Sequence, residues 1–189
     1  VTMREGAQIK SNLADQTGSV TTKSLRFSPD LSGTEWKALG MPLASAVIKN
    51  STEEEISAPS AQNVDNGIWF ARLKDNKTPE FVVDESTFGM AGLWAANGDT
   101  YTISSEGAFE FKTLEEPAAP TETGTFLMCS NPNTFTITLK QSAYILTTDG
   151  TSFEQEANPE IKPFQSFVLT DAKTLSTLRS LRIGDGVVT

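Results

Sequence analysis

Residues 134–139 read Thr-Phe-Thr-Ile-Thr-Leu, a strict alternation of threonine with large apolar side chains. A period of two places the apolar residues on one face of an extended chain, and threonine itself favours strands. Serine and threonine total 42 of the 189 residues, more than the 39 charged ones, so this composition extends along the whole chain. The expected fold class is therefore all-β.

Similar alternating runs, bounded by turn residues, recur with a spacing of about ten residues, which is typical of a sandwich or a barrel. They cover residues 1–4, 8–13, 19–27, 34–39, 67–73, 80–84, 92–96, 100–104, 108–112, 125–129, 143–148 and 165–170. We expect a β-sandwich with jelly-roll-like connections. Residues 171–178 predict one short C-terminal helix, because Asp171 is a good N-cap and leucines follow three residues apart.

Turn residues predict several direct hairpins. Asn97-Gly98 and Asp149-Gly150 are the pairs that accept positive φ at both central positions of a type I′ turn. Residues 74–78 predict a longer hairpin loop, and residues 104–107 predict a further turn between two strands.

Two polar stretches interrupt the strand pattern. Residues 114–123 contain three glutamates and two prolines and are expected to be a crossover within one domain. The alternative is a boundary there between two small β domains. Residues 51–60, with three consecutive glutamates, are expected to be a solvated loop.

The absent residue types exclude several kinds of chemistry. The chain has no histidine, so it can form neither a Ser-His-Asp nor a Cys-His catalytic unit and offers no imidazole to a metal. With one cysteine it can form neither an internal disulfide nor a cysteine-based zinc site. A net charge of −9 disfavours nucleic acid as a partner, and no apolar run is long enough to span a membrane.

The single cysteine, Cys129, lies in the apolar run 125–129 with no basic residue near it in sequence. We expect a small core side chain there; the alternative is a reactive thiol.

Carboxylate pairs can still hydrolyse glycosides without histidine. The acids on predicted strands are Glu35, Glu80 and Glu110, and nothing in the sequence brings two of them together. No catalytic residue is therefore assigned, and the chain is expected not to be an enzyme. No cofactor or metal is expected either, because Asp65, Asp99, Asp149 and Asp185 lie next to Asn or Gly, as turns require, without calcium-loop spacing.

Aromatic residues allow two interpretations. Trp36, Trp69 and Trp94 lie within apolar runs, which favours core packing. Alternatively, Trp69, Trp94 and Tyr101 form a ligand-binding surface for a sugar ring. The expected core consists of Phe27, Trp36, Leu39, Phe70, Phe111, Phe126, Phe135, Ile137, Phe164 and Phe167.

Three groups of segments resemble the β-rich C-terminal module of large secreted or surface-anchored proteins of Bacteroides and related bacteria. They are residues 22–27 with 35–43, residues 124–126 with 143–146 and 149–153, and residues 161–169 with 180–183. The resemblance covers most of residues 19–184. Two positions depart from the family's pattern: Gly40 stands where a cysteine is frequent, and Gln165 where a basic residue is common.

This resemblance implies a non-catalytic module at the cell surface or outside the cell, concerned with adhesion and binding a glycan or a host or surface protein. It also implies that residues 1–18 are β-helix-like strands ending an upstream repeat region of a longer polypeptide, with residues 19–189 forming the sandwich domain. The alternative function is a carbohydrate-active enzyme or a carbohydrate-binding module acting on polysaccharide.

Overall fold

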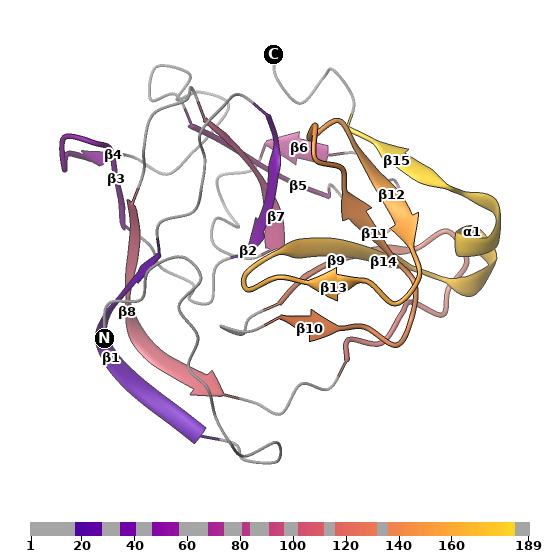
Figure 1. Ribbon diagram of the computed structural model, residues 1–189, viewed down its shortest axis with the longest axis horizontal. Coiled ribbons are helices and arrows are strands. Elements are labelled where there is room, and N and C mark those ends of the chain that lie inside the picture. Colours follow the sequence, from indigo (N-terminus) through magenta and orange to yellow (C-terminus); the bar gives the residue numbers. More distant parts are fainter. Residues whose placement is uncertain are drawn as a thin grey trace.

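The computed structural model describes residues 18–27, 35–40, 47–56, 68–73, 81–83, 91–96, 102–111, 116–131 and 136–183. For some strands the description covers the backbone alone. The described residues form several antiparallel sheets and one short helix, α1 (Ala172–Thr177), which confirms the all-β prediction (Figure 1).

The described strands belong to four sheets, here named A to D. Sheet A has the order β1 (Gly18–Phe27), β8 (Thr102–Phe111), β3 (Val47–Lys49), β4 (Glu55–Ile56), and sheet B the order β2 (Lys37–Gly40), β7 (Ala91–Ala96), β5 (Ile68–Leu73), β6 (Phe81–Val83). Sheet C has the order β15 (Ser180–Arg182), β12 (Ser152–Glu156), β11 (Ala143–Leu146), β14 (Ser166–Thr170), β9 (Phe126–Ser130), and sheet D pairs β10 (Ile137–Thr138) with β13 (Glu160–Ile161).

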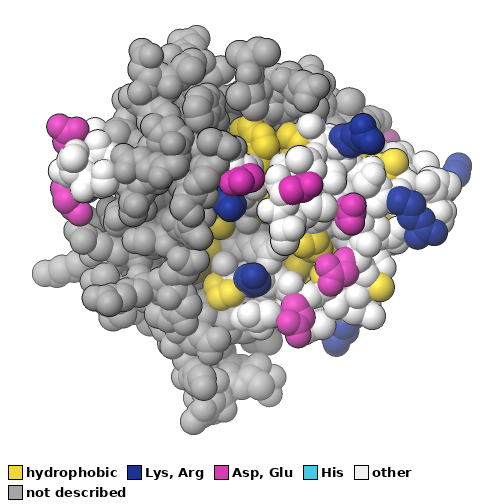
Figure 2. Space-filling view, turned by 45° about the horizontal axis from the view of Figure 1, so that its top comes forward, with side chains coloured by type: hydrophobic (Ala, Val, Ile, Leu, Met, Phe, Trp, Pro, Cys, Tyr) yellow, Lys and Arg dark blue, Asp and Glu magenta, His cyan; other side chains and the backbone are white. Residues whose placement is uncertain are grey.

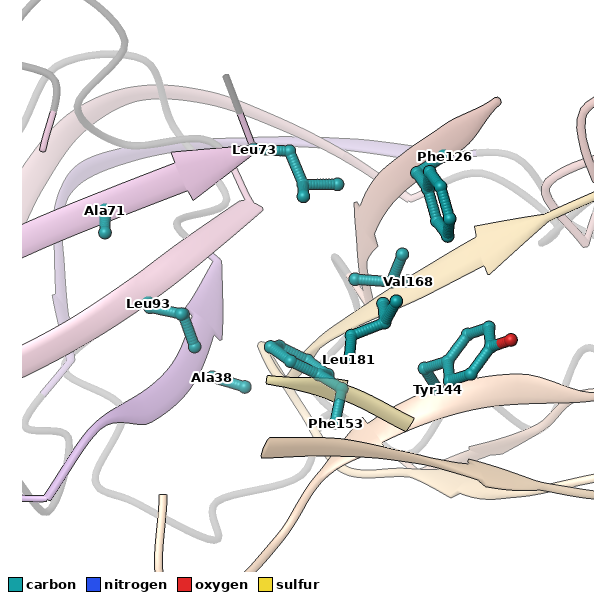
Figure 3. Packing of buried hydrophobic residues seen from close by; sticks show 9 residues of the cluster. All are labelled: Ala38, Ala71, Leu73, Leu93, Phe126, Tyr144, Phe153, Val168 and Leu181. Atoms are coloured by element: carbon teal, nitrogen blue, oxygen red, sulfur yellow. The ribbon is translucent and has the colours of Figure 1, made fainter. Parts of the chain in front are cut away.

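The main core lies between sheets B and C. Side chains from the two sheets point toward one another in Figure 3 and form one buried cluster. Its members are Ala38, Ala71, Leu73 and Leu93 from sheet B, and Phe126, Tyr144, Phe153, Val168 and Leu181 from sheet C. The cluster therefore joins residues on both sides of the connector 114–123.

Sheet C is also apolar on its other face. There Ala143, Phe167 and Leu169 pack with Leu139 and with Ile161 of sheet D in a second cluster. Because both faces are covered, every residue of the interior strand β14 is buried. This explains the nearly continuous apolar run in that strand, which a sheet with one solvated face would not need.

The predicted core is confirmed at Phe126, Phe164 and Phe167, which are buried. Trp36, Leu39 and Ile137 are only partly buried, so their full burial was a wrong prediction. Trp36 and Leu39 are an odd number of residues apart in an extended segment, so one face cannot hold both. The side chains of Phe27, Phe70, Phe111 and Phe135 lie outside the described residues.

Phe164 is buried for a reason that differs from strand alternation. It lies in the turn Lys162-Pro163-Phe164-Gln165, where the Gln165 amide donates to the Lys162 carbonyl at 3.1 Å. Phe164 has φ +59°, as in the third position of a type II turn, which normally requires glycine or asparagine. The buried Asn131 holds this turn, since its side-chain amide donates to the carbonyls of Ile161 at 3.0 Å and Lys162 at 3.1 Å.

The turn of residues 162–165 packs closely against strand β2 of sheet B. The Gly40 amide donates to the Phe164 carbonyl at 2.6 Å, and Leu39 forms an isolated bridge with Gln165. A Cβ atom at Gly40 would overlap the side chain of Ser130. The residues here must therefore be small, which accounts for the glycine at position 40.

The predicted C-terminal helix is confirmed, with Asp171 as its N-cap. Asp171 Oδ1 accepts from the amides of Lys173 and Thr174, both at 3.0 Å, and Oδ2 accepts from the amide of Gly124 at 2.8 Å. Hydrogen bonds from Thr174 make the largest contribution to lowering the pKa of Asp171 from 3.8 to about 2. The carboxylate thus ties α1 to the start of β9.

Replacing Asp171 by Asn should lower the urea midpoint of unfolding at neutral pH, because the amide cannot accept these bonds as a charged group. The folded-state pKa is depressed, so the stabilisation is present above the unfolded value of 3.8 and is lost as the pH falls through about 2. The gap between the midpoints of the native chain and Asp171→Asn should therefore close across this range. A Glu154→Gln control, at an exposed position, should show no gap; a gap for Asp171→Asn that persists unchanged at pH 2 would contradict the assignment.

Two hairpin predictions are confirmed by strand pairing. β5 and β6, on either side of residues 74–78, pair antiparallel, as do β11 and β12 around Asp149-Gly150. The predicted type I′ geometry of the second turn is wrong, since Gly150 has φ +69° but Asp149 is not in the positive-φ region. The Gly150 amide instead donates to the Thr147 carbonyl at 2.9 Å, which closes a longer loop.

The other two hairpin predictions are wrong. β7 and β8 flank Asn97-Gly98 but belong to sheets B and A, because both edges of β7 are already paired with β2 and β5. Residues 104–107 form no turn either, since β8 continues from Thr102 to Phe111. The irregularity there is a register shift between Thr22 and Leu25 of the neighbouring β1.

The polar stretches are partly as expected. Residues 116–123 form neither helix nor strand, and Glu116 accepts from the amides of Lys140 at 2.7 Å and Gln141 at 3.1 Å. In the acidic stretch, Ser51 to Glu55 are exposed, but Glu55 and Ile56 form β4, a strand not predicted.

Residues 1–17 lie outside the described residues, so the division at 18 stays a prediction. In the described part of the chain, no helix has the length and apolar character needed to cross a membrane.

Candidate functional site

The structure brings Glu35 and Trp36 against the turn between β11 and β12, which we call the corner: Glu35, Trp36 and residues 147–151. A Cβ atom placed on Gly150 would lie 2.7 Å from the backbone N and O of Trp36 and 3.1 Å from Glu35 Cβ. The turn therefore rests directly on the segment that leads into β2. Only glycine fits position 150, because of this contact and because of its positive φ.

The turn in the corner is held by the carboxylate of Asp149. Its Oδ1 accepts from Thr147 Oγ1 at 2.6 Å, from Thr151 Oγ1 at 2.9 Å and from the Thr151 amide at 3.2 Å. The hydrogen bond from the Thr147 hydroxyl makes the largest contribution to lowering the pKa of Asp149. Asp149 is thus an exposed, oriented and ionised acceptor at neutral pH.

The other side of the corner combines a carboxylate with an indole. Glu35 is exposed, whereas Trp36 is half-buried and packs in part against the core cluster between sheets B and C. Hydrophobic side chains reach the surface between acidic and basic ones on the face shown in Figure 2. The corner therefore exposes two carboxylates on segments that are in direct contact, next to a tryptophan that is half-buried.

The predicted ligand surface of Trp69, Trp94 and Tyr101 stays a prediction. Trp69 pairs with Ala95, and Trp94 with Phe70 and Lys37, so positions 69 and 94 belong to opposite faces of sheet B. Position 69 shares the face of the buried Ala71. The side chains of both tryptophans, and all of Tyr101, lie outside the described residues.

The other candidate acids are not brought together by the described residues. Glu110 lies in β8 opposite Ser19, and its side chain is not described; Glu80 lies outside the described residues. Asp65, Asp99 and Asp185 lie outside them as well. Within the described ranges, no group of three or more Cys, Asp or Glu residues is placed to hold a metal ion.

Cys129 is a free cysteine that packs partly buried against the cluster between sheets C and D. Burial raises the pKa of its thiol from 9.0 to about 11. The thiolate, which is the nucleophile, is therefore scarce at neutral pH. These observations favour the core interpretation over a reactive thiol.

Sequence reasoning did not bring Asp149 together with Glu35 and Trp36, and so did not predict the corner. The approach of the two segments is a long-range contact, and neither segment carries a local pattern that names its partner. The local signal in the sequence that relates to this contact is Gly150, because both the turn and the close approach of Trp36 require a glycine at that position.

No family model matches the chain, and comparison with curated proteins and with solved structures finds no match either.

Proposed function

We propose that the chain is a non-catalytic β-sandwich module with jelly-roll-like connections, part of a bacterial surface protein, that binds a glycan outside the cell. The observation that carries the binding function is the corner, where the segment of the exposed Glu35 and the half-buried Trp36 contacts the turn that bears the exposed Asp149. The extracellular setting is supported by the resemblance to Bacteroides surface modules. The sandwich architecture is supported by the cluster between sheets B and C.

The chemistry of the corner favours binding over hydrolysis. A glycosidase needs one carboxyl kept protonated by apolar surroundings, next to a second that is ionised. In the corner, the pKa of Asp149 is lowered by hydrogen bonds, which is the wrong direction for a general acid. Glu35 is exposed and so lies outside the apolar walls that such an acid needs.

The purified chain should be retarded in native gels that contain one or more soluble polysaccharides, and incubation with the same polysaccharides should release no reducing sugar. Release of sugar that is abolished by Glu35→Gln, with folding intact, would show a carbohydrate-active enzyme instead. Lack of retardation by every polysaccharide, together with binding to a surface protein, would replace the glycan by a protein partner.

A further inference from the structure

We draw no further inference here: the strongest candidate, the apolar patch on strand β9 where Leu127 is exposed on the same face as the partly buried Cys129, carries none, because nothing in the described part of the structure shows what covers it.

Discussion

Phe164→Gly is expected to unfold at a higher urea concentration than Phe164→Ala, although glycine is the smaller residue. Both substitutions remove a buried ring, at a cost of about 3 to 5 kcal/mol. Alanine must also adopt the positive φ of position 164, +59°, which costs about 1 to 2 kcal/mol for a residue with a Cβ atom. Glycine adopts this conformation without strain.

Phe167 is the matched control, because it is fully buried but lies within the regular strand β14. There the order should be reversed, with Phe167→Gly less stable than Phe167→Ala by about 0.5 to 1 kcal/mol. Urea midpoints of the four variants measure both differences. If Phe164→Gly is less stable than Phe164→Ala, as is expected at position 167, then position 164 is not strained.

Gly40→Ala is expected to destabilise the chain by about 3 kcal/mol, at the upper end of what overpacking costs in a core. The new methyl group would overlap the side chain of Ser130 on β9. The strand cannot easily move away, because Gly40 pairs with Ala91 on one side and donates to the Phe164 carbonyl at 2.6 Å on the other.

Ser130→Gly should recover part of this loss when combined with Gly40→Ala, since it removes the atoms that the methyl group meets. Alone, Ser130→Gly should cost about 0.5 to 1 kcal/mol as a glycine in a strand. The double variant should therefore be more stable than Gly40→Ala, with a favourable coupling energy in the cycle. If the double variant loses as much stability as the two single variants added together, the overlap between the new methyl group and Ser130 is not the cause of the destabilisation.

Local signals in the sequence predicted most strands and the helix. Asp171 predicted the start of α1 because an N-cap acts within three residues, and the Asp149-Gly150 pair predicted a hairpin because its strands are adjacent in sequence. The short strands β3, β4, β13 and β15 were missed, since two or three residues carry no readable alternation. The partner of a strand is not a local property, so Asn97-Gly98 predicted a hairpin where β7 and β8 belong to different sheets.

The candidate site shows the same division between local and distant interactions. Each part of the corner has a local signature, an aromatic residue after an acid at Glu35-Trp36 and an Asx-type turn at Asp149. Their contact depends on how sheets B and C pack, which no short segment encodes. Phe164 is the converse case, because its burial was predicted while its backbone conformation was not.

The order of the strands in sheet C has a consequence for the synthesis of the chain. β14 must insert between β11 and β9, and the edge strand β15 ends at Arg182, so the sheet is complete only when that residue has been made. The last strand of sheet B in the sequence ends at Ala96, and its apolar residues Ala71 and Leu93 lack a complete sheet C to pack against until Arg182 has been made. Translation from residue 96 to residue 182 takes roughly 4 to 17 seconds at ribosomal speed, so during this interval the nascent chain presents an apolar sheet face that can aggregate.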